Sequence, residues 1–115
     1  MRNDVNYKVG VYTFKPSGRI AGHDSKAFRE SIFQALPNNS HRPLKLLFDF
    51  HDVKMMDSTG LGALMEVYIS VTRKGGRVGI INVGAHINNL LVMSHLISHF
   101  EHFDSENEAI LALRN

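Results

Sequence analysis

Apolar and polar side chains alternate at the beginning of the chain, first over Val5–Val9 and then over Val11–Phe14. Alternation with a period of two is typical of a strand with one buried face. Gly10 separates the two segments, so the pattern predicts an early pair of antiparallel strands. The next four residues, Lys15–Gly18, have the composition of a turn.

Further along the chain, apolar residues recur at helical spacing in three segments, and a capping box of Ser105 and Glu108 marks a fourth helix. Residues 37–40 read as the loop that ends the first helix. The predicted helices are a segment that begins near Asp24 or Ser25 and stops before Pro37, then Thr59–Lys74, Ile87–Leu96, and a short helix after Ser105.

Short apolar segments separate these helices. Leu44–Phe50 carries large apolar residues on both faces, which suits a strand in the middle of a sheet covered by helices. Arg77–Val83 is predicted as a further strand, and His99–Phe103 as a short strand at an edge. The residues between Phe50 and Thr59 are predicted to form a loop.

The alternation of strands and helices predicts an α/β fold with right-handed crossovers. We expect a mixed, mostly parallel sheet of four to five strands, with the N-terminal pair antiparallel, packed by about four helices. A chain of 115 residues fits one domain, so we expect a single domain over residues 1–115.

Composition excludes several classes of site. The chain has no cysteine, which removes disulfides, thiolate metal sites and cysteine nucleophiles. Its 13 basic and 11 acidic residues are scattered, and direct nucleic-acid binding would need a concentrated basic face. No apolar run has signal-peptide form or approaches the roughly 20 residues that cross a bilayer. We therefore expect a cytoplasmic protein without membrane insertion or cofactor.

The segment Met55–Gly62 lies where a buried strand has ended and a helix begins, the usual place for a functional site in an open α/β sheet. Ser58 is predicted as the N-cap of that helix, and Thr59 is the other hydroxyl within reach. Gly60 and Gly62 each cost roughly 1 kcal/mol relative to alanine in a helix interior. Such glycines suggest a bare helix start that a partner chain can approach.

A phosphate suits the same position. A phosphoserine carries about −1.5 to −2 charges at neutral pH, and a helix N-terminus offers free N–H groups and a positive dipole end. The domain would carry the modification without unfolding. The dianion would nevertheless be hard to bury in an interface that lacks a cation, which makes Ser58 a candidate binding switch.

The six residues Asp57–Gly62, with the sequence D-S-T-G-L-G, resemble the D-S-[ST]-G-L-G signature of STAS domains, specifically the bacterial anti-sigma factor antagonists. The resemblance extends to the strand Leu44–Phe50, the glycine pair after the helix, the strand Arg77–Val83 and the terminal helix. It implies phosphorylation at Ser58. The positions implied to contact a partner are Asp57, Ser58, Thr59, Gly60, Leu61, Gly62 and Asp24.

In that family, the unphosphorylated protein binds an anti-sigma factor that is also a GHKL-type serine kinase, and this releases the sigma factor. The kinase uses ATP to phosphorylate the serine, the complex dissociates, and a PP2C-type phosphatase resets the switch. The segment Gly18–Asp24 departs from the family's G-x-[LI]-D-like pattern, with Asp24 as a shifted replacement for the acid. The alternative within the fold is a subunit of another assembly, such as a lipid-transport ABC ATPase or a stress-sensing complex.

Other interpretations of these residues remain open. Ser58 is also a candidate nucleophile, although the G-x-S-x-G elbow of serine hydrolases is absent. Asp57 lacks the second carboxylate loop of aspartic proteases. His95, His99 and His102 form a possible metal-binding group, but the predicted strand near His99 breaks their helical spacing.

Overall fold

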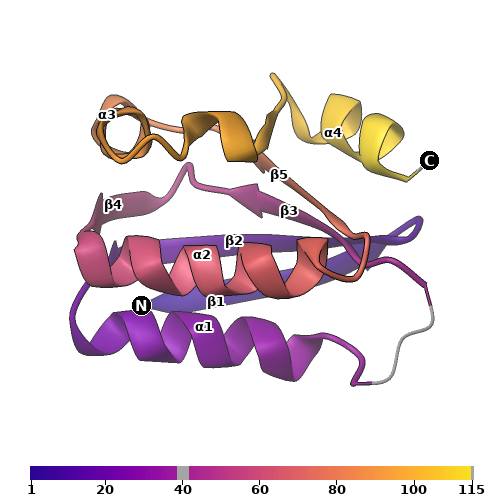
Figure 1. Ribbon diagram of the computed structural model, residues 1–115, viewed down its shortest axis with the longest axis horizontal. Helices are drawn as coiled ribbons and strands as arrows, with labels where there is room; N and C mark the ends of the chain where they lie inside the picture. The colour runs from indigo at the N-terminus through magenta and orange to yellow at the C-terminus, as the bar shows by residue number, and fades with distance from the viewer. Residues whose placement is uncertain (39–41, 115) are drawn as a thin grey trace.

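The computed structural model describes residues 1–38 and 42–114, in which a twisted sheet lies between helices on two faces (Figure 1). Loop residues 39 and 40, predicted above, fall outside the described residues. In chain order the elements are β1 (Arg2–Lys8), β2 (Val11–Ile20), α1 (His23–Ala35), β3 (Lys45–Asp49), β4 (Val53–Met56), α2 (Ser58–Thr72), β5 (Arg77–Ile81), α3 (Ala85–Met93), a 3₁₀ turn (Ile97–His99), β6 (Glu101–His102) and α4 (Glu106–Leu113).

The sheet has the order β1-β2-β3-β5-β6, and β4 pairs with the second half of β2. Only the β1–β2 pair is antiparallel among the pairings in the described chain. The predicted α/β fold with a mostly parallel sheet and an N-terminal antiparallel pair is therefore confirmed. The sheet has six strands rather than four to five, because β4 lies in the segment predicted as a loop.

The strand β3 separates two hydrophobic cores, as its apolar residues on both faces predict. Leu46 and Phe48 face the larger core, which α1 and α2 cover. Leu47 faces the smaller core under α4, with Val11 and Ile81. Because β3 is buried on both sides, it holds the two layers in one unit.

The segment Lys15–Gly18 is strand rather than turn, which corrects the prediction. It continues β2, and Pro16 lies opposite Asn3 of β1. The parallel pairing of β2 with β3 ends at Phe14, and its pairing with β4 begins at Gly18. Pro16 therefore lies in a part of β2 that has no parallel partner, where a strand tolerates a residue without an N–H more readily than in the middle of a sheet.

The ends of the helices are partly as predicted. Helix α1 begins at His23 behind Gly22, which has φ 55°, so neither Asp24 nor Ser25 is the N-cap. Helix α2 ends as expected, with Gly75 at φ 80° and the Gly76 N–H donating to the carbonyl of Val71 at 2.9 Å. The side chain of Ser105 accepts from the N–H of Glu108, which confirms the cap of α4.

No helix within residues 1–38 and 42–114 combines the length and apolar character needed to cross a bilayer. The longest, α2, has 15 residues, and one face of it is buried against the sheet.

We expect Phe48→Ala to lower the free energy of unfolding by about 3–5 kcal/mol, because the ring is fully buried and stacks on Phe14 at a centroid distance of 5.4 Å. Phe33→Ala is the matched control, because that ring is 37% exposed and should cost far less. Urea unfolding of both variants measures the difference. Equal losses would contradict the assignment of Phe48 to the central core.

Candidate functional site at the start of helix α2

The motif residues Asp57–Gly62 and Asp24 lie at one end of the molecule. The parallel strands β2 and β4 end there at Ile20 and Met56, and helices α1 and α2 begin directly after them (Figure 1). The loop between β2 and α1 therefore lies beside the start of α2. This is the end of an α/β sheet at which functional sites usually occur.

Asp57 is the N-cap of α2, so the assignment of this role to Ser58 was wrong. The Oδ1 atom of Asp57 accepts the N–H of Gly60 at 2.9 Å, as an N-cap side chain does. Ser58 is the first helical residue and is exposed. Its hydroxyl makes no hydrogen bond with any described residue, so the helix does not need it.

The hydroxyl of Thr59 is fully used, in contrast to that of Ser58. It donates to Oδ1 of Asp57 at 2.6 Å and accepts the N–H of Gly22 at 3.0 Å. The hydroxyl of Ser25 lies 2.9 Å away, and it must be the donor because the Thr59 proton is already given to Asp57. One donated and two accepted bonds exhaust a hydroxyl group. The geometry thus separates two neighbouring hydroxyls that composition alone could not distinguish.

The carboxylate of Asp57 connects the two loops. Its Oδ2 atom accepts the N–H of Gly22 at 3.2 Å, while Oδ1 binds within α2. The hydrogen bond from Thr59, followed by that from the Gly60 N–H, holds the pKa of Asp57 below its ordinary value. The hydrogen bonds of the site therefore favour the ionised form of the Asp57 carboxyl group.

The two glycines of the motif have different roles. A Cβ on Gly60 would lie 2.0 Å from the carbonyl oxygen of Ile20, so this glycine lets α2 approach the end of β2. Gly60 is buried and is not available to a partner, contrary to the expectation from the sequence. A Cβ on Gly62 would meet nothing within 4 Å, and this residue is exposed. Gly62 alone provides the bare helix surface.

A groove of about 350 Å³ runs between the first turns of α1 and α2. Thr59, Gly62 and Ala63 line it from α2, and Lys26 and Arg29 line it from α1. Arg29 also bonds Glu66 of α2 at 2.9 Å, which closes one end with an ion pair. The groove begins at Thr59, the residue after Ser58, and gives this end of the molecule a concave surface.

The other predicted contact residues have mixed environments. Asp24 lies in the first turn of α1, its side chain is 47% exposed, and Oδ1 is 3.9 Å from the amino group of Met1. The structure therefore brings Asp24 to the same end as Ser58. Leu61 is 9% exposed and belongs to the larger core, so it anchors the helix start.

Sequence reasoning missed two residues that shape the site. Ser25 supports Thr59 from within α1, where it is 4% exposed. His86 of α3 reaches across to the last residue of β4, with its Nε2 3.2 Å from the carbonyl oxygen of Met56. The sequence shows Ser25 only as a serine near the start of a predicted helix, and nothing in it links His86 to this end.

The three C-terminal histidines take separate environments. The ring of His99 lies 5.7 Å from that of Tyr68, and His102 Nε2 lies 2.8 Å from the carbonyl oxygen of Ile97. His95 has φ 61°, which ends the helical spacing before His99. Among the described residues, no three histidine or carboxylate side chains converge as metal ligands would.

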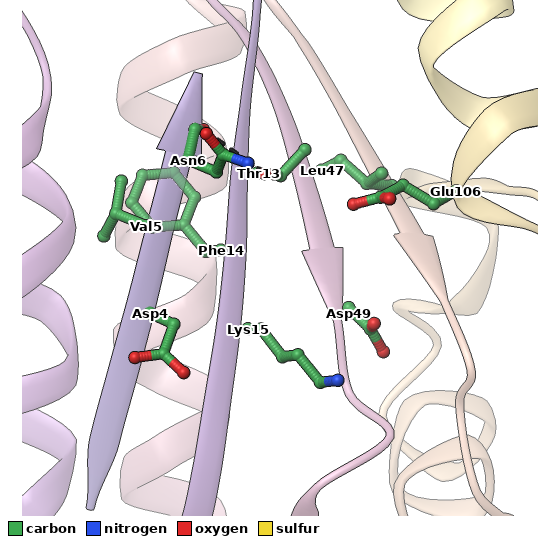
Figure 2. Close-up of a pocket in the computed structure, with 9 residues that line it drawn as sticks. All are labelled: Asp4, Val5, Asn6, Thr13, Phe14, Lys15, Leu47, Asp49 and Glu106. Carbon is green, nitrogen blue, oxygen red and sulfur yellow. Dashed lines mark hydrogen bonds between the residues drawn. The ribbon is translucent and has the colours of Figure 1, made fainter. Parts of the chain in front are cut away.

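A second hollow, of about 320 Å³, lies on the outer face of β1, β2 and β3 beside α4 (Figure 2). Three of its four charged lining side chains have partners of opposite sign, and the fourth, Asp49, binds a neutral amide. These are Asp4 with Arg2 at 3.0 Å, Lys15 with Asp52 at 3.6 Å and Glu106 with Lys8 at 3.8 Å, and Asp49 accepts an N–H of Asn82 at 3.0 Å. We interpret this face as a solvated network of ion pairs.

Substitution of the two motif glycines should give opposite results. Gly60→Ala should destabilise the fold by about 1–3 kcal/mol or more, because the new methyl meets the Ile20 carbonyl. Gly62→Ala should be neutral or add up to about 1 kcal/mol, because the methyl meets open space and alanine favours a helix. Chemical denaturation of the pair measures both effects. A stable Gly60→Ala variant would disprove the close approach of α2 to β2.

The contribution of the Asp57 carboxylate to stability should depend on pH. Its pKa in the folded protein is lowered from 3.8, so its stabilising effect is full above about pH 4 and is lost as the pH falls through the folded value. The difference in melting temperature between the native protein and Asp57→Ala should be constant from about pH 5 to 8 and shrink below about pH 4. A difference that does not change with pH would rule out the ionised clamp.

Comparisons with known proteins agree with this arrangement. The STAS domain family matches residues 4–109. The anti-sigma F factor antagonist of Paenibacillus polymyxa is 26% identical over 110 residues, which are 96% of this chain and 92% of the relative.

Two solved structures share the fold. An anti-sigma factor antagonist from Mycobacterium paratuberculosis has a TM-score of 0.83, with 21% identity over 99% of this chain and 94% of that one. The anti-sigma factor antagonist SpoIIAA in its unphosphorylated form has a TM-score of 0.77, with 19% identity over 98% of this chain and 96% of that one. The chain therefore belongs to the STAS domain family, and its relatives include regulatory proteins named anti-sigma factor antagonists.

Proposed function

We propose that this protein is an anti-sigma factor antagonist that binds its partner through the start of α2, and that phosphorylation of Ser58 ends the binding. The observation that carries the proposal is the contrast between two adjacent hydroxyls. Ser58 is exposed and makes no hydrogen bond with a described residue, whereas Thr59 is consumed by Gly22, Ser25 and Asp57. A kinase reaching this surface therefore meets one acceptor hydroxyl.

The chemistry of the modification fits the helix start. The Ser58 oxygen would attack the γ-phosphorus of ATP while a base of the kinase takes its proton. The bond from the γ-phosphorus to the bridging β–γ oxygen would break, and ADP would leave. The product, a phosphoserine at the first helical position, would be favoured by the positive end of the helix dipole. Because Asp57 is the cap, the modification removes no hydrogen bond from the helix. The fold should tolerate the phosphate.

The same phosphate would disrupt a protein interface. It adds up to two negative charges directly beside the Asp57 carboxylate, which is kept ionised by its hydrogen bonds. Burying this pair of anions against another protein requires a cation from the partner. A partner built to bind the neutral hydroxyl lacks that cation and is released.

The residues of the motif divide the work of binding. Ser58 and Gly62 are exposed and would touch the partner, and Asp24 would add a charged contact from α1. Asp57, Thr59 and Gly60 hold the two loops together, and Leu61 fixes the helix in the core. The groove between α1 and α2 would accept a side chain of the partner.

We infer that the partner is an anti-sigma factor with GHKL-type serine kinase activity, and that a PP2C-type phosphatase reverses the reaction.

The test uses the purified anti-sigma factor kinase from the same organism with ATP. Ser58→Ala should bind as tightly as the native protein but should neither be phosphorylated nor be released. Ser58→Asp should weaken binding at least about tenfold, since one charge in the interface replaces a neutral group. Calorimetry measures the affinities, and mass spectrometry locates the phosphate.

Two matched variants control for charge and for the neighbouring hydroxyl. Ser98→Asp adds the same charge to an exposed serine outside the surface and should leave the affinity within about twofold. Thr59→Val removes the other hydroxyl and should still be phosphorylated at Ser58. Phosphate on Thr59, or equal binding by the Ser58→Asp and native proteins, would contradict the switch.

A further inference from the structure

A hollow of about 520 Å³ lies at the end of the molecule opposite Ser58. It is formed where β3 and β5 begin, next to the β1–β2 turn and the end of α4 (Figure 1). Its walls come from Tyr7 and Tyr12 of the hairpin and from the turn at Gly75. Parallel strands separate it from the phosphorylation surface, so it is an independent feature.

The charge of this hollow has one sign. Four basic side chains line it, and no carboxylate does so among the described residues. They are Arg42, Lys45, Arg77 and Arg114. The whole chain carries a net charge of only +2, so this concentration is a local property rather than a reflection of composition. A concave surface lined by charges of one sign concentrates ions of the opposite sign.

The basic side chains of the hollow differ in how many hydrogen bonds and ion pairs they make with the rest of the protein. The guanidinium of Arg77 is fixed by Glu101 at 2.8 Å and by the carbonyl oxygen of Ala112 at 3.0 Å. Lys45 lies directly beside it in the register of β3 and β5. The side chains of Lys45 and Arg114 have no ion pair or hydrogen bond with any described residue. These two cations are therefore available to a ligand, beside an arginine whose position is set.

The tyrosines give the hollow a rigid wall. The rings of Tyr7 and Tyr12 lie 4.6 Å apart between centroids, and Tyr7 is 58% exposed. A phenol can donate a hydrogen bond to a phosphate oxygen, and the ring face offers contact area at little cost in conformational entropy. The combination of several cations and a phenol suits an anion with more than one charged group.

We propose that this hollow, the basic end formed by Tyr7, Lys45, Arg77 and Arg114, binds a small molecule that carries two or more phosphate groups. Lys45 and Arg114 supply the uncompensated charge. Arg77 lines the hollow as a fixed side chain, because its Nε and Nη2 atoms donate to Glu101 and its Nη1 atom donates to the carbonyl oxygen of Ala112. The site does not use Ser58 and does not depend on the switch. Phosphate groups of this kind occur on soluble metabolites and on lipid headgroups.

The probe is inorganic tripolyphosphate, titrated into the full chain at near-physiological salt and followed by amide NMR and calorimetry. We expect saturable shifts at Tyr7, Gly75 and Arg77. The double substitution Lys45→Gln and Arg114→Gln should weaken binding at least about tenfold, because it removes both unpaired charges. Thermal unfolding of that variant should match the native protein, which separates lost binding from lost folding.

The matched control is the double substitution Lys26→Gln and Lys54→Gln, which changes the net charge equally but lies near the opposite end. It should leave the affinity within about twofold. Equal weakening by the two variants, shifts spread over the whole surface, or no saturable binding would each overturn the proposal. Vesicles of phosphatidylcholine with phosphatidylinositol bisphosphate identify the source of the phosphate. If the native protein sediments with these vesicles and the Lys45/Arg114 variant does not, the ligand is a lipid headgroup. If the protein binds tripolyphosphate but not the vesicles, the ligand is a soluble molecule.

Discussion

The carboxylate of Asp57 is the interaction on which the site depends. It caps α2 through the N–H of Gly60 and reaches the N–H of Gly22 in the loop before α1. The two loops are separated by 35 positions in the sequence, and Thr59 joins them a second time by accepting the same N–H of Gly22. Because both helices begin at this one charge, its loss would free the helix start and the loop together. Hydrogen bonds to an ionised acceptor are stronger than neutral ones, which is why a carboxylate suits this position.

The clamp also explains why one hydroxyl is available and its neighbour is not. Once Asp57 takes the cap, Thr59 is positioned to donate to it and to accept from Gly22. Ser58, between them, makes no hydrogen bond with this network and is exposed. If Ser58 were the cap, the proposed phosphate would be added to the same atom that holds the first turn of the helix. Placing the cap one residue earlier separates the stability of the fold from the state of Ser58.

Much of the fold could be predicted because its signals are local. A few neighbouring residues suffice to predict each of three features. These are the alternation in the first strands, the strand at Leu44–Phe50 with apolar residues on both faces, and the glycines that end α2. The strand β4 could not be predicted, because its four residues gain strand character only from pairing with β2. Pro16 was misread for a related reason, since its place in a strand depends on which neighbours pair around it.

The site shows the same limit more sharply. The motif drew attention to Ser58, but the choice between Ser58 and Thr59 rests on Gly22 and Ser25, which lie more than 30 positions away. The roles of Gly60 and Gly62 likewise differ only because Ile20 faces one of them. A spacing of two glycines suggests close approach without saying whether the approaching group belongs to the same chain. Distant residues that fold back onto the helix start decide which atoms remain for a partner.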